Sequence, residues 1–188
     1  LRLSAGGVDI AVPAAFVAGD ASIASIEVPV AGGYPCVELK DVGHSLTTTF
    51  SLAVVGTRYE ASVALRQGDS NDDDLCDMVD FAIFIDAVGA AAAGGPSNFN
   101  DDLLVNNADF SFLAVYGMQS GDACGSFDGG APQDRISIRE LRRRGLGHLA
   151  VADLNGDGWV DFDDVAIYLR DGIPRGHRPT LSGPETVQ

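Results

Sequence analysis

Apolar and polar residues alternate along the first third of the chain, a pattern typical of half-buried β-strands. The alternating positions are Val8, Ile10 and Val12; Ile26, Val28 and Val30; Leu46, Phe50, Leu52 and Val54; and Tyr59, Ala61, Val63 and Leu65. Glycine residues separate these four stretches. Strands joined by glycine turns predict a small antiparallel β-sandwich, similar in kind to an Ig-like domain, over residues 1–66.

Beyond residue 66 the apolar period becomes helical. Phe81, Phe84, Ile85 and Val88 follow the i, i+3, i+4, i+7 spacing of a helix that buries one face. The same kind of pattern recurs twice, at Phe110, Leu113 and Ala114 and at Val165, Tyr168 and Leu169. Each helical stretch follows an Asp/Asn-rich segment, so the sequence predicts an internal loop-helix repeat.

These patterns predict an α+β protein in which a β-sandwich is followed by loop-helix repeats. We expect one pair of units over residues 67–118, a second pair over 119–172, and an alanine- and glycine-rich connection at 90–96. Residues 173–188 hold Pro174, Pro179 and Pro184 with few apolar residues, which predicts an extended tail.

Charge narrows the classes of function. The 188 residues include 27 acidic and 12 basic side chains, a formal net charge of −15. Nucleic acid and anionic membrane surfaces are therefore excluded as expected partners, because both are bound by basic surfaces. No stretch approaches the roughly 20 apolar residues of a membrane span. The start of the chain lacks a signal-peptide pattern, so we expect any such peptide to be removed or to lie outside it.

The acidic segment at residues 153–164 has the spacing of a calcium loop. Ca²⁺ takes six to eight oxygen ligands, and a twelve-residue loop supplies them from side chains at positions 1, 3, 5, 9 and 12 and from the carbonyl at 7. Here these positions hold Asp153, Asn155, Asp157, Trp159 (carbonyl), Asp161 and Asp164. Gly158 occupies position 6, where the chain turns sharply, and Val160 at position 8 is expected to point into the core.

Residues 69–80 repeat this spacing. The candidate ligands are Asp69, Asn71, Asp73, Leu75 (carbonyl), Asp77 and Asp80. Position 6 is Asp74, a residue that tolerates a left-handed backbone better than most. A solvated acidic run is the alternative interpretation.

Residues 98–109 form another candidate loop. Its candidate ligands are Asn98, Asn100, Asp102, Leu104 (carbonyl), Asn106 and Asp109, with Val105 at the inward position. Three of the five side chains are neutral, so we expect this loop to be the weakest, and a metal-free turn is the alternative. The sequence thus predicts two to three Ca²⁺ ions.

A fourth unit lacks most ligands. Ile136, Ser137 and Glu140 match the end of a loop, but the earlier ligand positions hold Gly129 and Ala131. We expect no metal there, and we expect Ile136 to face Val160 across a short ribbon. The arginines of the helix over 138–144 are interpreted as a solvated face that balances the acidic loops.

The three cysteines, Cys36, Cys76 and Cys124, allow one disulfide and leave an odd thiol. Cys76 should face inward at position 8, and we considered a bond to Cys124 that leaves Cys36 free. The histidines, His44, His148 and His177, lie in no catalytic signature, and His44-Ser45 is interpreted as a surface pair. The sequence therefore predicts no enzymatic activity.

The runs Gly68-Asp-Ser-Asn-Asp-Asp-Asp-Leu-Cys-Asp-Met-Val-Asp-Phe81 and Asp153-Leu-Asn-Gly-Asp-Gly-Trp-Val-Asp-Phe-Asp-Asp-Val165 resemble dockerin repeats. Such repeats are EF-hand-like, but they end the loop in Asp and have a helix only after it. Residues 69–117 look like one dockerin pair. The run from Cys36 to Ala61 more loosely resembles the β-rich module that precedes such repeats in secreted or surface proteins of planctomycete-like bacteria.

The resemblance implies a secreted or cell-surface protein, and two roles follow from it. In the first, calcium stabilises the repeats of an extracellular structural protein, with self-assembly or a protein partner. In the second, a dockerin pair docks its carrier onto a cohesin-like partner through a helix face that includes Ser111 and Phe112.

Overall fold

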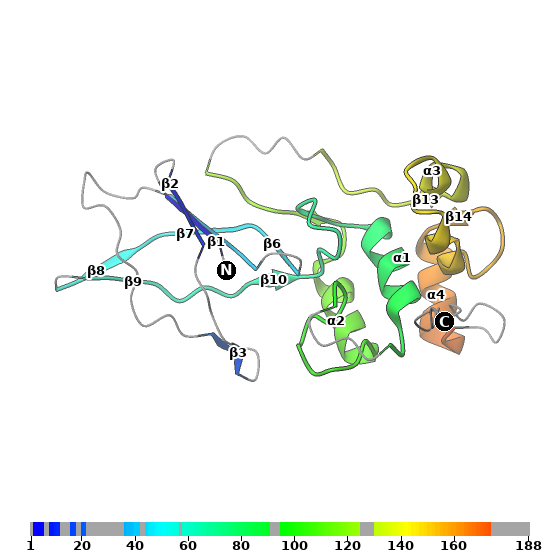
Figure 1. Ribbon diagram of the computed structural model, residues 1–188, viewed down its shortest axis with the longest axis horizontal. Helices are drawn as coiled ribbons and strands as arrows, with labels where there is room; N and C mark the ends of the chain where they lie inside the picture. The colour runs from blue at the N-terminus through cyan, green and yellow to red at the C-terminus, as the bar shows by residue number, and fades with distance from the viewer. Residues whose placement is uncertain are drawn as a thin grey trace, which may run out of the picture.

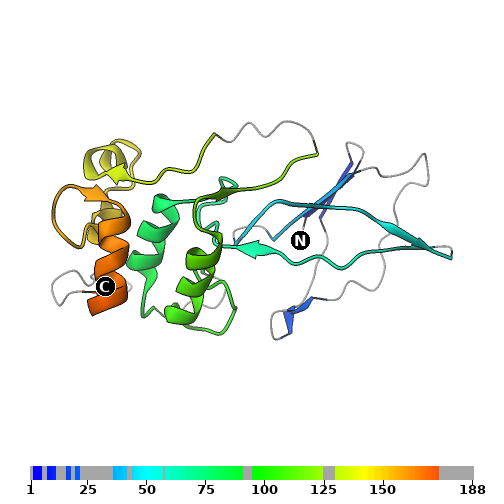
Figure 2. The same cartoon turned by 180° about the vertical axis from the view of Figure 1, so that it is seen from behind.

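The computed structural model describes residues 2–5, 8–11, 16–17, 20–21, 36–41, 44–56, 58–90, 95–124 and 130–173. The predicted strand around Ile26, Val28 and Val30 and nearly all of the predicted tail lie outside these residues. Figures 1 and 2 show the described strands of the first 60 residues at one end of the molecule and the helices at the other. No helix in the described part is long and apolar enough to cross a membrane.

The described residues up to Gln67, called the β-part below, contain one four-stranded antiparallel sheet. Its strand order is β2-β1-β5-β7. Its strands are β1 (Arg2–Ala5), β2 (Val8–Ala11), β5 (Val37–Lys40) and β7 (Thr48–Phe50). Leu3 pairs with Ile10 on one side and with Leu39 on the other, and Val37 pairs with Phe50. The predicted antiparallel β-structure is therefore present.

The other strands form two-stranded pairs. They are β3 (Phe16–Val17) with β4 (Asp20–Ala21), β8 (Ala53–Val55) with β9 (Arg58–Glu60), and β6 (Ser45–Leu46) with β10 (Arg66–Gln67). The alternating run expected at 46–54 is thus divided into shorter strands, and of the run expected at 59–65 only residues 59 and 60 lie in a strand. The described residues show an antiparallel sheet and ribbons, and two face-to-face sheets are not among them.

Three of the helices begin in the same way. They are α1 (Met78–Ala87), α2 (Asn107–Tyr116) and α4 (Phe162–Asp171). Their N-caps are Asp77, Asn106 and Asp161, and in each case the aspartate three residues later completes a capping box. The acidic segments therefore start the helices that the apolar spacing predicted, because the caps satisfy N–H groups that lack helical partners.

The remaining elements complete the C-terminal half. They are β11 (Leu75–Cys76), β12 (Gln119–Ser120), β13 (Ile136–Ser137), α3 (Ile138–Arg143), the 3₁₀ helix η1 (Gly147–Ala152) and β14 (Trp159–Val160). Helix α1 lies between α2 and α4 in both views (Figures 1 and 2). The expected helix over 138–144 is confirmed to within one residue.

One hydrophobic core joins all of these helices. Phe84 and Ile85 of α1 are fully buried, as are Leu141 of α3 and Leu149 of η1. Leu46 of β6 is buried in the same core. The aromatic rings of Phe84 and Tyr168 pack edge to face with their centroids 5.5 Å apart, a favourable geometry for such pairs. The core therefore crosses the boundary that the sequence suggested between residues 118 and 119.

Candidate metal centres

The three predicted calcium loops share one backbone conformation. The fourth and sixth residues of each loop have positive φ, a left-handed region that most side chains avoid. At the fourth position φ is 61° for Asp72, 57° for Asp101 and 76° for Gly156, and at the sixth it is 66° for Asp74, 90° for Leu103 and 92° for Gly158. The three loops, named loop 1 (residues 69–80), loop 2 (98–109) and loop 3 (153–164), are therefore structurally equivalent.

Side-chain oxygens at positions 1, 3 and 5 gather on one side of each loop. The first residue accepts a hydrogen bond from the backbone N–H of the fifth, at 3.2 Å in loops 1 and 2 and 3.1 Å in loop 3. The asparagine at position 3 accepts from the same N–H. Its amide also donates to the carboxylate of the fifth residue, at 2.9, 2.9 and 3.1 Å. The predicted spacing thus corresponds to a spatial cluster.

The aspartate at position 12 closes each loop. Asp80, Asp109 and Asp164 are fully buried. One carboxylate oxygen accepts an N–H near the start of the loop, from Ser70 at 2.7 Å, Asn100 at 3.3 Å or Leu154 at 2.7 Å. The other accepts the N–H of the ninth residue at 2.7, 2.9 and 2.9 Å. This bridge brings the ninth and twelfth positions close to the first.

Burial shifts the proton affinity of these carboxyl groups. It raises the pKa of Asp80 well above the ordinary value, although backbone N–H groups of Asp77 and Ser70 act in the opposite direction. Burial also raises the pKa values of Asp164 and Asp69. The ionised form is disfavoured in each case because burial removes water from the charge. A bound cation would favour the ionised form again.

The donor set fits a hard cation. Each loop offers carboxylate, amide and backbone carbonyl oxygens, which are the ligands that Ca²⁺ prefers. Histidine, cysteine and carboxylate side chains alone do not form a metal-holding group of three or more in the part of the chain that the structure describes. A calcium ion in such a loop would be held also by asparagine amides and by the carbonyl at position 7.

The residue at position 8 points inward in every loop, as expected. Cys76 and Val160 are fully buried and Val105 is 1% exposed. The predicted ribbon between the fourth unit and loop 3 is confirmed, because β13 pairs with β14 and places Ile136 opposite Val160.

Loops 1 and 2 pair with other segments through this position. Cys76 lies opposite Gln119 in the β11–β12 ribbon. In loop 2, the carbonyl of Val105 accepts the N–H of Gly89 at 2.9 Å, and the N–H of Val105 donates to Ala90 at 3.3 Å. The residue at position 8 of each loop is therefore anchored next to the core.

Loop 1 has a cationic neighbour that the sequence analysis missed. The Lys40 ammonium lies 2.9 Å from Asp69 Oδ2, 2.7 Å from Asp72 Oδ1 and 3.5 Å from Asp74 Oδ1. Burial lowers the pKa of Lys40, but the three carboxylates together raise it by more. The pKa of Lys40 therefore lies above its ordinary value. The available signal was compositional, since Lys40 is the only lysine in the chain.

The fourth unit uses its glutamate differently. The carboxylate of Glu140 binds Arg143 at 2.6 Å and Arg144 at 2.8 Å. The guanidinium groups lower the pKa of Glu140, Arg144 having the largest effect. Two of the helix arginines are thus paired with the residue that occupies position 12 of this unit.

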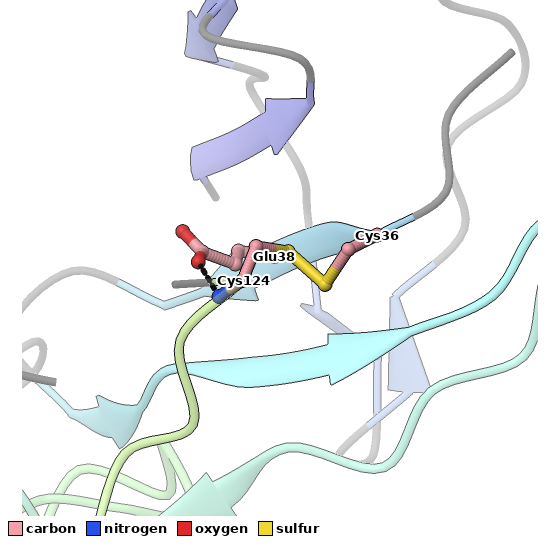
Figure 3. The surroundings of a disulfide bond; sticks show 3 residues. All are labelled: Cys36, Glu38 and Cys124. Atoms are coloured by element: carbon pink, nitrogen blue, oxygen red, sulfur yellow. Dashed lines mark hydrogen bonds between the residues drawn. A yellow bond between two sulfur atoms is a disulfide. The ribbon is translucent and has the colours of Figure 1, made fainter. Parts of the chain in front are cut away.

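The disulfide joins Cys36 to Cys124 (Figure 3). Cys76 is the free, buried thiol. A bond between Cys76 and Cys124 with Cys36 free is therefore wrong. The inward orientation of Cys76, correctly expected, is the reason: its side chain lies in the core, where burial raises the pKa of the thiol. The backbone N–H of Cys124 also donates to the Glu38 carboxylate on β5 (Figure 3).

The interpretation of His44-Ser45 as a surface pair is also wrong. Ser45 is fully buried and accepts the N–H of Asp41 at 2.9 Å. The half-buried His44 ring donates from Nε2 to the carbonyl of Gly95 at 2.9 Å. The Asp41 carboxylate is the main cause of the raised pKa of His44. This segment therefore connects the β-part with residues just before loop 2.

Comparison of the chain with protein-family models, with curated proteins and with solved structures finds no match. The three loops and the surfaces around them are therefore the features from which a function can be inferred.

Proposed function

We propose that the chain is an extracellular or cell-surface structural protein in which two to three Ca²⁺ ions stabilise dockerin-like loop-helix units. The observation that carries the proposal is the common geometry of residues 69–80, 98–109 and 153–164. Each loop gathers oxygens from positions 1, 3 and 5 and is closed by a fully buried aspartate. A buried carboxylate is costly unless it is paired or coordinates a metal.

The proposal ranks the loops by charge. Loops 1 and 3 each have aspartate at four of the five side-chain positions, whereas loop 2 has aspartate only at Asp102 and Asp109. Because calcium affinity follows the charge of the ligands, loop 2 is the weakest site. Loop 3 ranks first because Gly158 adopts its left-handed backbone without the strain that Asp74 bears in loop 1.

A structural role is favoured over a sensing role by the way in which the loops connect to the fold. The ninth and twelfth residues, proposed as ligands, also cap α1, α2 and α4. The eighth residue of each loop is buried beside the core. Calcium that holds the loops in this form would stabilise the helices that follow them, because binding to the native state adds to folding free energy. We propose no catalytic role, since calcium spacing accounts for the carboxylates.

Thermal unfolding in excess calcium and in excess chelator tests this role. We expect calcium to raise the midpoint, since free ligand at 100 times Kd adds about 2.7 kcal/mol per site. The variant Asp157→Asn removes a ligand charge from loop 3 and should reduce the calcium effect. Asp163→Asn removes an exposed charge from the same segment without touching a ligand position and should not. An equal midpoint in calcium and chelator would contradict the proposal.

A docking role is the second candidate, favoured by an apolar groove between α1, α2 and α4. The groove has a volume of about 310 Å³, and its lining includes Phe81, Leu113 and Val165. Phe162 and Leu169 line it as well and are 54% and 66% exposed. The earlier expectation centred on α2 is less favoured, because Phe112 is half-buried and packs on Phe99 at 6.1 Å.

Size measurement and capture experiments separate these roles. If the groove docks a cohesin-like partner, Phe162→Ser and Leu169→Ser abolish calcium-dependent capture and leave the calcium-dependent midpoint unchanged. If the protein assembles with itself, the purified chain shows a larger size in calcium than in chelator. Capture that survives both substitutions would argue against the groove as the docking surface.

A further inference from the structure

Loop 1 differs from loop 3 at the residue where the backbone most needs glycine. Position 6 is Asp74 in loop 1, with φ of 66°, and Gly158 in loop 3, with φ of 92°. A non-glycine residue in this region is disfavoured by about 1–2 kcal/mol. The side chain of Asp74 must therefore contribute interactions that glycine lacks.

Those interactions reach two segments outside the loop. The Asp74 carboxylate accepts the N–H of Thr47 at 2.6 Å, next to β6. Its backbone carbonyl accepts the N–H of Gly121, next to β12, at 2.8 Å. The fit is close, because a Cβ at Gly121 would lie only 2.2 Å from Asp74 Oδ2. Asp74 thus occupies a junction of three chain segments.

Two basic residues complete this junction. Lys40 of β5 contacts Asp69, Asp72 and Asp74, and its side chain is 13% exposed. Arg66 of β10 donates to the carbonyl of Thr47 at 2.8 Å and lies 3.1 Å from Asp122 Oδ2. The β-part therefore contacts loop 1 through β5, β6 and β10 and the residues next to them.

The carboxylates of loop 1 fall into two sets, one at the positions proposed to bind Ca²⁺ and one in contact with the Lys40 ammonium. Six aspartates occur in residues 69–80, and Asp69, Asp73, Asp77 and Asp80 occupy ligand positions. Asp72 and Asp74, at positions 4 and 6, are not ligands in such a loop. They are the groups that Lys40 contacts in addition to Asp69 Oδ2. Asp69 links the two sets, because its Oδ2 accepts the N–H of Asp74 while Oδ1 accepts that of Asp73.

We propose that loop 1 is a calcium-dependent joint, in which Asp74 and Lys40 couple metal binding at Asp69 to the docking of β5, β6 and β10 on the helical part. The inference rests on the proposed calcium binding and adds Asp74 and Lys40 as positioning residues. Metal at loop 1 fixes the Asp69 carboxylate and thereby the groups bound to it. Coupling is reciprocal, so docking of the β-part also strengthens calcium binding at loop 1.

Hydrogen exchange of the full chain, followed by mass spectrometry in excess calcium and in excess chelator, tests the joint. The informative peptides cover residues 44–48, 66–67 and 119–122, with residues 153–164 as an internal reference. For the wild-type chain, we expect calcium to slow exchange both in the three junction peptides and in the reference segment 153–164. The expected change at the junction is about 5- to 150-fold, the usual range for coupled sites.

Asp74→Gly is the decisive variant, and Leu103→Gly is its matched control. Both introduce glycine at position 6, where φ is positive, but Leu103 is 62% exposed in loop 2. We expect Asp74→Gly to abolish the calcium effect at the junction and to keep it at 153–164, whereas Leu103→Gly keeps both. Asp74→Asn, which retains an acceptor for Thr47, should restore part of the effect.

A second readout uses the single lysine. The acylation rate of Lys40 should be lower in calcium than in chelator for the wild-type chain. In Asp74→Gly the difference between the rates in calcium and in chelator should be smaller, because Lys40 loses the contact with Asp74 and keeps those with Asp69 and Asp72. The joint is overturned if calcium protects 153–164 but leaves the junction and Lys40 unaffected, or if Asp74→Gly behaves as the wild type. Absence of any calcium response would overturn the proposed calcium binding and the joint together.

Discussion

At the scale of single residues, the three loops differ in what compensates the left-handed backbone at position 6. Gly158 suits its left-handed backbone, Asp74 has partners that compensate the strain, and Leu103 has a 62% exposed side chain at φ of 90°. Nothing in the structure explains leucine at this position. Its conformational cost is therefore expected to appear directly in stability.

We predict that Leu103→Gly stabilises the protein by about 0.5–1 kcal/mol. Relief of the left-handed strain, about 1–2 kcal/mol, exceeds the entropy that glycine adds to the unfolded chain. Urea unfolding in chelator measures the change. Leu104→Gly, at a 49% exposed neighbour outside the positive-φ set, is the control and should destabilise. Equal effects of both substitutions would argue against strain at Leu103.

At the scale of elements, each acidic segment has two tasks. Asn106 caps α2 by accepting the N–H of Ala108 at 2.8 Å, and it is also a proposed ligand in loop 2. Aspartate performs the same capping task in α1 and α4. Aspartate at residue 106 should therefore change metal affinity without disturbing the start of the helix.

We predict that Asn106→Asp strengthens calcium binding at loop 2, because it adds a third carboxylate to that ligand set. Calorimetric titration should show the weakest site tightening by about tenfold or more, a change of about 1.4 kcal/mol. Ser111→Asp adds the same charge to an exposed position of α2 and serves as the control. Similar tightening in both variants would indicate a general charge effect and contradict ligation by residue 106.

At the scale of the whole molecule, one core connects units that the sequence divided into two pairs. Leu141 of α3, Leu149 of η1 and Phe84 of α1 are buried in the cluster that also holds Leu46 of β6. Loss of packing in one unit should therefore also destabilise the others, as expected for a core that unfolds cooperatively.

We predict that Leu141→Ala destabilises the protein by about 2–5 kcal/mol and keeps a single unfolding transition. Coincident transitions followed by far-ultraviolet circular dichroism and by the fluorescence of Trp159 would show cooperativity. Leu169→Ala, on the exposed face of α4, should cost much less. Two separate transitions in the wild-type chain would contradict a shared core.

The features that the sequence predicted are those encoded locally. Apolar spacing located α1, α2 and α4, ligand spacing located the three loops, and the loop-like residues Ile136, Ser137 and Glu140 located α3, because helix periods and capping groups lie within a few residues of one another. The left-handed fourth position escaped notice, although Gly156 hints at it in loop 3.

The features that were missed depend on distant contacts. Lys40 meets Asp69 across 29 residues, and the disulfide joins cysteines 88 residues apart. Neither spacing leaves a periodic trace in the sequence. The alternation around Phe50 predicted strands correctly in kind, whereas Val63 lies outside any strand, because only Tyr59 and Glu60 of that run belong to β9. Pairing decided where each strand begins and ends.

The bond between Cys36 and Cys124 closes a covalent ring that contains loops 1 and 2 together with α1 and α2. A single peptide-bond nick inside this ring would open it without releasing any fragment. The nicked protein would keep its mass on a non-reducing gel and separate only after reduction. For the extracellular role proposed above, this means that one proteolytic cut between the β-part and the helices leaves the proposed calcium loops attached to the β-part.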